Sequence, residues 1–263
     1  MGKNQKKIGE QLSKMSYRNA KPIEWEPYKG EEIISNITIR KGKKIFDKEY
    51  YYDKAKVTPR GKAYVIGNGP SRKGFDLKRL GATGQTYGCN ALYRDFIPDF
   101  IFSVDAPITQ EMYKNNVHKK CIHYAPSLEV GRYPYKHCGI NKSDLHLIPN
   151  NPHWISGSVA MWTATVHGHS EIYLIGYDFR EYGRDQLNNI YQDTPIYGHR
   201  DSDTIFTGWL SQFRSLQVMR PNCKFTVVHD DPPEFLLVSN PGANDGRFRI
   251  ISYAEFDKEL TPR

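Results

Sequence analysis

The chain contains few cysteines and no cysteine pair of the CxxC type. The four cysteines lie far apart in a chain of 263 residues, at Cys89, Cys121, Cys138 and Cys223. This spacing excludes the common zinc motifs, and it does not suggest the disulfide framework of small secreted domains. We therefore expect reduced thiols, as in a cytoplasmic protein.

Long hydrophobic runs are also absent. No stretch reaches the roughly 18 apolar residues that a membrane span needs, and the start "MGKNQKKIGEQLSK" has no apolar segment typical of a signal peptide. Hydrophobic residues make up 38% of the chain, which suits a soluble globular core. We expect a cytoplasmic protein with one main domain.

The positive charge is concentrated near the N-terminus. Residues 1–60 contain 15 Lys and Arg against 8 Asp and Glu, a net charge of +7, whereas the other 203 residues contain 22 against 21. The segment, with its aromatic run "EYYYDK", could bind a polyanion such as DNA through phosphate contacts and stacking. It could equally be a solvated arm with surface lysines. Within it, "EIISNITIR" alternates as a strand does.

From residue 61 onward, short apolar strands alternate with helical segments. We expect strands at "AYVIG", "PDFIFSVD", 171–175 and 224–228, and a strand with a turn at "TYGCNALY". We expect helices from about Ser158 to His167 and around Trp209, Phe213 and Leu216. This rhythm predicts an α/β fold, a single Rossmann-like parallel sheet flanked by helices. Residues 107–152 look like a loop-rich insertion or lid, which contains strands at "KKCIHYAPS" and "DLHLIP". We therefore divide the chain into an arm, 1–60, and a domain, 61–263.

The first strand runs into "GNGPS". Ligands of open parallel sheets bind beyond the carboxyl ends of strands, where this loop lies. Gly67 and Gly69 would let the backbone approach a phosphate or ribose, Asn68 offers an amide, and Ser71 could cap a following helix. A tight connection from strand to helix without a ligand would look the same, because the loop lacks the full spacing of known phosphate-binding motifs.

A second group of small residues occurs in "ISGSVAM". Ser156, Gly157 and Ser158 stand at the start of a predicted helix, where free backbone N–H groups and the helix dipole favour an anion. The alternative is that serine simply caps the helix. Together the two loops predict a site for a phosphorylated ligand.

Four motifs, "VIGNGPS", "CNALY", "ISGSVAMWTATVHGHSEIYLIGYDF" and "YGH", resemble in order and spacing those of the family 42 sialyltransferases and the related DUF115 group. The resemblance covers roughly residues 62–230. It implies a family 42-like variant of the GT-A fold and a cytidine nucleotide held by Gly67, Asn68, Gly69 and Asn90, together with Ser156 and Gly157 at the helix start. With Ser71 of the glycine loop, these are the seven residues that we predict for the nucleotide site.

The same resemblance implies that His199 of "YGH" is the general base that deprotonates a hydroxyl acceptor. The nearby Asp201 or Asp203 could orient its ring. A histidine in a polar surface loop would look the same. The family places tyrosine hydroxyls against the leaving phosphate just after "GxDF", whereas this chain has Arg180 and then Tyr182. Arginine would suit a more highly charged leaving group, such as a diphosphate. Tyr191 and Tyr197 are further candidates for this role.

A metal requirement stays open on the sequence. "DSD" at 201–203 spells a short acidic pattern that many nucleotide-sugar enzymes use to bind Mg²⁺ or Mn²⁺, and Asp105 ends a predicted strand. Donors with one phosphate need no bridging metal, so we expect no required cofactor and assign no metal ligand.

These observations predict an inverting glycosyltransferase that uses a CMP-sugar or, as the other option, a UDP-sugar. The acceptor would be a hydroxyl, and the basic arm suggests a hydroxylated base in DNA, as in a DNA-modifying enzyme of a bacteriophage. One alternative is an enzyme like the archaeal pterin pyrophosphokinase of the DUF115 group, which would use ATP and Mg²⁺. Another is a non-catalytic module that binds nucleic acid.

Overall fold

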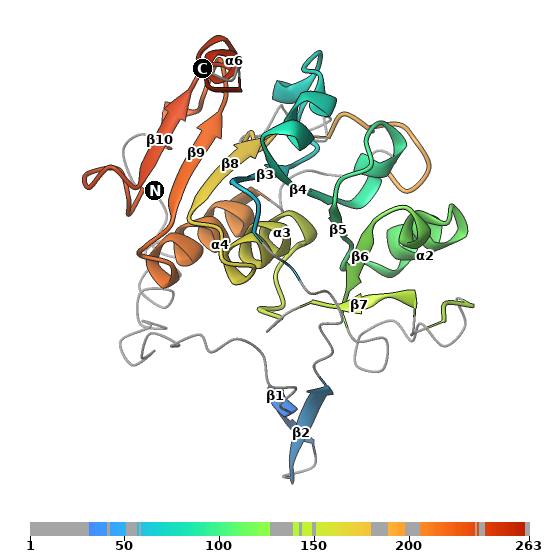
Figure 1. Cartoon of the computed structure of the whole chain (residues 1–263). Coiled ribbons are helices and arrows are strands. Elements are labelled where there is room, and N and C mark those ends of the chain that lie inside the picture. Colours follow the sequence, from blue (N-terminus) through green and yellow to red (C-terminus); the bar gives the residue numbers. More distant parts are fainter. Residues whose placement is uncertain are drawn as a thin grey trace.

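The computed structural model describes residues 32–40, 43–50, 57, 59–126, 139–141, 144–148, 151–179, 189–197, 206–234, 236 and 240–260. Within these ranges, eight strands form one open sheet in the order β10-β9-β8-β3-β4-β5-β6-β7 (Figure 1). Every neighbouring pair in this sheet is parallel. The predicted α/β class with a single parallel sheet is confirmed.

The strands of this sheet are short, and helices follow most of them. The strands are β3 (Lys62–Ile66), β4 (Gly84–Cys89), β5 (Phe100–Phe102), β6 (Ile122–Ala125), β7 (His146–Leu147), β8 (Glu171–Ile175), β9 (Lys224–Val228) and β10 (Phe248–Ile251). The α-helices are α2 (Ala106–Lys114), α3 (Ser156–Val166), α4 (Phe206–Met219) and α6 (Tyr253–Leu260). The 3-10 helices are η1 (Pro70–Arg72), η2 (Leu77–Ala82), η3 (Asn90–Arg94) and η4 (Val117–Lys119).

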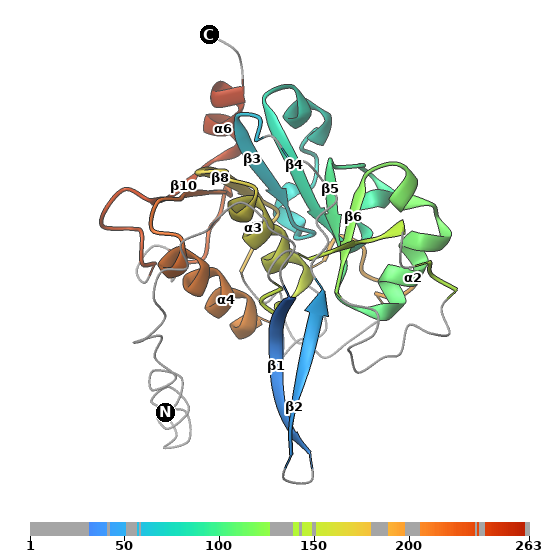
Figure 2. The ribbon, with the colours of Figure 1, turned by 60° about the horizontal axis from the view of Figure 1, so that its bottom comes forward.

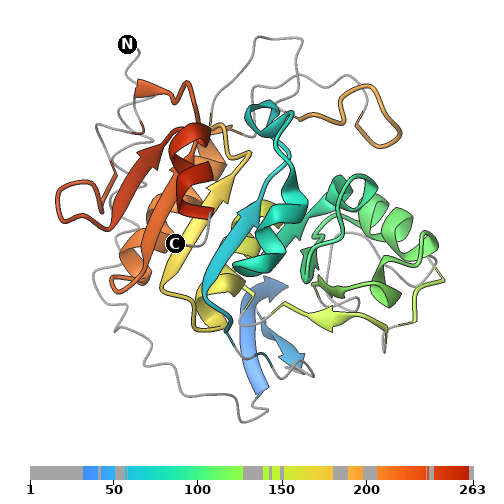
Figure 3. The ribbon, with the colours of Figure 1, turned by 45° about the horizontal axis from the view of Figure 1, so that its top comes forward.

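Helices cover both faces of the sheet. Helix α3 packs against β3, β4 and β5, with α4 beside it. Helix α6 and the 3-10 helices η1 and η2 lie on the opposite face (Figure 3). Alternate residues of β3 therefore enter different cores: Val65 joins the cluster under α3, and Tyr64 and Ile66 join the cluster under α6. All three are 0% exposed, which explains why the strand reads as a continuous apolar run.

The order in which strands are added to the sheet reverses at β3, although all strands stay parallel. Strands β3 to β7 are laid down in sequence toward one edge, and α3 then carries the chain back so that β8 pairs with the free side of β3. In open α/β sheets, such a reversal leaves a crevice at the carboxyl ends of the two central strands. Here these strands are β3, which runs into the glycine loop, and β8.

Several predicted elements are confirmed closely. Strands β8 and β9 have the predicted bounds. Helix α3 begins at Ser156, two residues before the prediction, and the chain turns after it at Gly168, which has a φ of +94°. In α4, Phe213 and Leu216 are fully buried as expected, and Trp209 is partly buried. The C-terminal pair of β10 and α6 was not predicted.

The predicted strand "EIISNITIR" is also confirmed. It forms β1 (Glu32–Arg40), which pairs with β2 (Lys43–Tyr50) in a separate antiparallel sheet (Figure 2). Residues 1–31 lie outside the described residues. The division of the chain at residue 60 stays a prediction.

Residues 107–152 contribute more regular structure than a loop-rich insertion suggests. Most of α2 lies there, and the two strands predicted within it are β6 and β7 of the main sheet. Residues 127–138 of this stretch lie outside the described residues, so the lid interpretation stays a prediction.

In the described part of the chain, no helix combines the length and the hydropathy that crossing a membrane would require.

Candidate functional site

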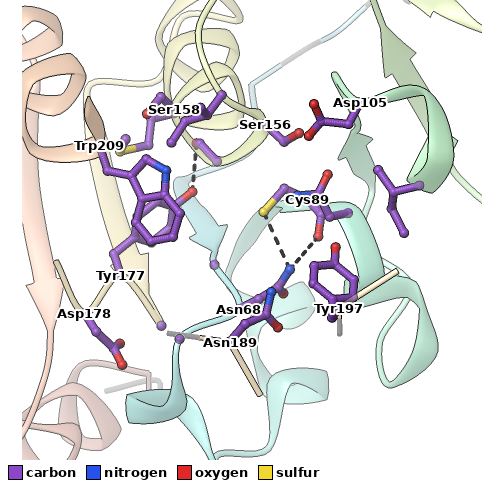
Figure 4. A pocket seen from close by; sticks show the side chains of 18 of the residues that line it. Asn68, Cys89, Asp105, Ser156, Ser158, Tyr177, Asp178, Asn189, Tyr197 and Trp209 are labelled. Carbon is purple, nitrogen blue, oxygen red and sulfur yellow. Dashed lines mark hydrogen bonds between the residues drawn. The ribbon is translucent and has the colours of Figure 1, made fainter. Parts of the chain in front are cut away.

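A pocket of about 510 Å³ opens at the carboxyl ends of the central strands (Figure 4). Its walls come from the loops that follow β3, β4, β5 and β8 and from the first turns of α3. The described residues that line it include six of the seven predicted for the nucleotide: Gly67, Asn68, Gly69, Asn90, Ser156 and Gly157. Segments far apart in the sequence thus meet at the crevice that the sheet topology predicts.

The two glycines of the first loop serve close packing against the segment after β8. The backbone N–H groups of Gly67 and Gly69 donate to the carbonyls of Ile175 (2.8 Å) and Gly176 (2.9 Å). A Cβ on Gly67 would overlap the Gly176 carbonyl, and a Cβ on Gly69 would overlap the Asp178 carboxylate. These two N–H groups are therefore already used within the fold. The close approach of this backbone to a phosphate or ribose stays a prediction.

This packing predicts that a larger residue at position 69 lowers the stability of the fold. We expect Gly69→Ala to destabilise the fold by about 1–3 kcal/mol, because the added methyl group overpacks a buried contact. The melting temperature should fall by several degrees in thermal unfolding. Gly81→Ala is the matched control, since a Cβ there meets nothing within 4 Å. Equal melting temperatures for the two variants would contradict the packing role.

Two of the asparagines that line the pocket have buried amide oxygens. The Asn68 side chain donates from Nδ2 to the backbone carbonyl of Cys89 (3.1 Å), which fixes the orientation of the amide. The Oδ1 atoms of Asn68 and Asn90 are buried and have no hydrogen-bond partner among the described residues. A buried acceptor without a partner costs free energy, and a ligand that donates an O–H or N–H group would satisfy it.

Asn90 also has a strained backbone, as do two other residues of the pocket. Its φ is +53°, and Phe179 and Ile196 have φ values of +49° and +75°. Asparagine tolerates this left-handed region, but phenylalanine and isoleucine rarely adopt it. Such strain of about 1–3 kcal/mol per residue persists only where surrounding contacts impose it, and it is often found at functional sites.

Ser71 has a different role from the predicted one. It lies inside η1 and caps no helix. Its backbone N–H donates to Asp178 Oδ2 (3.1 Å), and its hydroxyl donates to Asp178 Oδ1. The Asp178 side chain is 0% exposed, and its Oδ1 lies 3.9 Å from Nε2 of His229. Ser71 is not among the residues that line the pocket; it ties the glycine loop to the end of β8.

The first turn of α3 forms another wall. The N-cap residue is Ile155, whose side chain makes no capping hydrogen bond. The interpretation of Ser156 as the cap is therefore wrong. The Ser156 hydroxyl instead accepts from the backbone N–H of Val104 (3.0 Å), and the Gly157 carbonyl accepts from the Tyr177 hydroxyl (2.8 Å). The N-cap side chain thus makes no capping bond to the first N–H groups of α3, whose start carries a partial positive charge.

The pocket has one apolar, aromatic side. Tyr177 and Trp209 are in this wall (Figure 4), and Met161 and Phe179 also line the pocket. Trp209 Nε1 is buried and finds no hydrogen-bond acceptor among the described residues. Burial raises the pKa of the Cys89 thiol to about 12, so Cys89 is a neutral thiol and not a nucleophile.

Tyr191 and Tyr197, the further candidates for stabilising the leaving phosphate, occupy different positions. Tyr197 lines the pocket, and burial raises the pKa of its phenol, which therefore remains protonated. Tyr191 does not line it: its hydroxyl accepts from Arg72 Nη2 (2.9 Å) and donates to Asp95 Oδ1 (2.6 Å). Tyr191 is thus a structural residue that holds the 189–197 turn against the glycine loop.

The predicted catalytic residues His199, Arg180 and Tyr182 lie outside the described residues, as do Asp201 and Asp203. Their roles stay predictions. Asp105, the other acid considered for a metal, lines the pocket. Among the described residues, no group of three or more His, Cys, Asp or Glu side chains could hold a metal ion.

Sequence reasoning did not assign Tyr177, Asp178, Phe179 or Trp209 individually to the site. The first three directly follow β8, so the rule that ligands bind at carboxyl ends of strands was a usable signal for them. Trp209 gave no such signal, because it lies on the apolar face of α4 and reads as an ordinary core residue.

No family model matches the chain, and no curated protein matches it. Solved structures that are similar to it include two sialyltransferases. One is the sialyltransferase CstII from Campylobacter jejuni in complex with the substrate analogue CMP-3FNeuAc, with 19% identity over 63% of this chain and 81% of that chain and a TM-score of 0.43. The other is an alpha-2,3-sialyltransferase from Campylobacter jejuni in apo form, with 18% identity over 69% and 79% and a TM-score of 0.45.

Proposed function

We propose that this protein is an inverting glycosyltransferase that moves a sugar from a nucleotide-activated donor to a hydroxyl acceptor. One observation carries the proposal: the residues that the motif resemblance assigns to the nucleotide converge on one pocket, although they come from three separate segments of the chain. The pocket lies at the reversal point of the sheet, where open α/β folds bind nucleotides.

The chemistry of the pocket supports a ligand rich in hydroxyl groups. The side-chain oxygens of Asn68 and Asn90, which have no partner in the described part of the chain, are acceptors, and Asp105 adds a carboxylate. Ribose and sugar hydroxyls donate to such groups. The helix start at Ser156 and the Trp209 indole supply the complementary donors.

In this proposal, transfer is a direct displacement at the anomeric carbon. His199 removes the proton of the acceptor hydroxyl as the new bond forms, and Arg180 and Tyr182 stabilise the departing phosphate. The pocket holds the nucleotide so that the two reactants are aligned. A CMP-sugar is the favoured donor and a UDP-sugar the other option. No cofactor is required for this step, and Mg²⁺ or Mn²⁺ would assist only a diphosphate leaving group.

A thermal shift panel tests the nucleotide site. CMP, UDP, their sugar conjugates and ATP with Mg²⁺ are each added to the full chain. A ligand at about 100 times its Kd stabilises the native state by about 2.7 kcal/mol, a rise of several degrees for a chain of this size. Binding of CMP or UDP supports the proposal. Binding of ATP with Mg²⁺ alone would favour a pyrophosphokinase, and no binding would remove the nucleotide site.

For the acceptor, we propose a hydroxylated base in DNA, on the charge of residues 1–60 alone. If the arm neutralises DNA phosphates, the logarithm of the binding constant should fall with the logarithm of salt concentration by about 0.9 per contact on duplex. Deleting residues 1–56 should flatten this slope and leave the nucleotide shift unchanged. A salt series with duplex and single-stranded DNA measures both. Failure to bind DNA at low salt would remove DNA as the acceptor.

For the compartment, we propose the cytoplasm, that of the host if the protein is viral. Cys89, Cys121 and Cys223 are free thiols in the described part of the chain, as expected in a reducing compartment.

A further inference from the structure

The turn of residues 189–197 brings three side chains into the wall of the pocket. Asn189, Ile196 and Tyr197 line the pocket, and Figure 4 labels the first and the last of them. No helix or strand forms within this described segment, in which an isolated bridge joins Thr194 to Tyr197. The position of these side chains therefore depends on bonds between the turn and the rest of the fold.

The glycine loop and Tyr191 hold the first half of the turn. The backbone N–H of Ile190 donates to the carbonyl of Asn68 (2.8 Å), and the Tyr191 hydroxyl makes the two bonds described above. None of these bonds involves residues 194–197. The second half of the turn needs an anchor of its own.

Arg94 is this anchor. Its Nη1 donates to the Thr194 hydroxyl (2.7 Å), and its Nη2 donates to the Pro195 carbonyl (3.1 Å). On the other side, Glu111 of α2 accepts from Nε (3.1 Å) and from Nη2 (2.6 Å). The two charged side chains are 21% and 18% exposed, so salt screens this pair less than a surface pair. Four bonds use most of the five N–H donors of the guanidinium, which makes Arg94 a clamp between α2 and the turn.

The clamp belongs to the same short helix as a residue predicted for the nucleotide. Helix η3 begins at Asn90 and ends at Arg94. Asn90 lines the pocket, and the backbone of Ala91 hydrogen-bonds to the Tyr197 hydroxyl. Arg94 and Thr194 do not line the pocket. Helix η3 thus forms one part of the wall directly, through Asn90, and holds another part from behind, through Arg94.

We propose that Arg94 is a positioning residue for the nucleotide site, which holds the second half of the turn, and with it Tyr197, in the geometry that binds the nucleotide. This inference rests on the proposed function. When the turn is released for part of the time, only the molecules with the turn in place bind, and the apparent Kd rises as their fraction falls. Ile196 favours release, because its φ of +75° is a strained conformation for a β-branched residue.

Thr194→Val tests the clamp by isothermal titration of the full chain with CMP and with UDP. The substitution keeps the shape of the side chain and removes the hydroxyl that accepts from Arg94 and donates to the Tyr191 carbonyl (2.6 Å). For a nucleotide that binds the wild type, we expect the Kd to rise about fivefold or more. Thr194→Ser keeps the hydroxyl, and its Kd should stay within about twofold of the wild type.

Arg94→Gln is the second variant, and we expect it to raise the nucleotide Kd about tenfold or more. It also leaves Glu111 without its cation and should lower the melting temperature. Arg249→Gln is the matched control, because Arg249 makes similar bonds to Glu259 (2.8 Å) and to the Tyr173 hydroxyl (3.1 Å) and does not line the pocket. The control should lose stability as well, but its nucleotide Kd should equal that of the wild type.

A nucleotide Kd within twofold of the wild type in Thr194→Val or in a folded Arg94→Gln would overturn the inference and leave the nucleotide site intact. If Arg94→Gln does not fold, the two Thr194 variants decide. Equal losses in Thr194→Val and Thr194→Ser, or an equal loss in Arg249→Gln, would also overturn it, because the clamp would then not be the cause. If neither CMP nor UDP binds the wild type, the proposed function fails, and this inference is overturned with it.

Discussion

Asn68→Ala and Asn90→Ala should each reduce the rise in melting temperature that a bound nucleotide produces to about half of the wild-type rise or less. The Oδ1 atoms of both residues lie buried at the pocket without a partner among the described residues, so a ligand N–H or O–H group is their natural complement. A hydrogen bond lost from a ligand to such a site costs about 1–3 kcal/mol, since the ligand group is left unpaired as well. The nucleotide affinity should fall about tenfold to a hundredfold.

The variants must be compared at their own baseline stability. Asn68→Ala also removes the bond from Nδ2 to the Cys89 carbonyl and should lower the melting temperature of the free protein slightly. Asn240→Ala is the matched control: Asn240 is equally buried and also has an Oδ1 atom without a described partner, but it does not line the pocket. Unchanged nucleotide affinity in both pocket variants would show that the site is assigned wrongly.

His199→Ala should lower the turnover of a donor by about a hundredfold or more, the usual contribution of a positioned general base. Donor affinity should change little, because the base contacts the acceptor and not the nucleotide. The measurement is the initial rate of nucleotide release from the donor, determined in the presence of acceptor, together with donor binding by titration. A fall in kcat with an unchanged donor Kd would identify a group that acts only in the transition state.

A second histidine provides the control for this experiment. His153 lies in the exposed loop before α3 and does not line the pocket, so His153→Ala should retain wild-type turnover. If His199→Ala turns over at nearly the wild-type rate, a different group deprotonates the acceptor. The pyrophosphokinase alternative would then gain weight, because that reaction has no use for a histidine base.

The sequence alone determined the sheet and the place of the site. Strands β8 and β9 could be predicted residue by residue because a strand buried on both faces reads as a short apolar run with polar or small residues at its ends. Because the carboxyl ends of parallel strands share one edge, Gly67, Asn90 and the segment at Ser156 could be expected to meet. The C-terminal pair β10 and α6 had weaker signals: Arg249 and Ile250 of β10 are not buried, so its pattern is broken.

Only the tertiary structure decided what each residue of the site does. Whether the Gly67 and Gly69 N–H groups face a ligand or the segment after β8 depends on the pairing of β3 with β8, which are about 100 residues apart in the chain. The same pairing brings Ser71 to Asp178. Ser71, which the local sequence predicts to be a helix cap, therefore connects two loops through hydrogen bonds. The backbone N–H of Val104 reaches the Ser156 hydroxyl only because α3 returns across β5. Local sequence patterns report backbone propensity and burial, and they contain no information about which distant hydrogen-bonding group will stand opposite a given side chain.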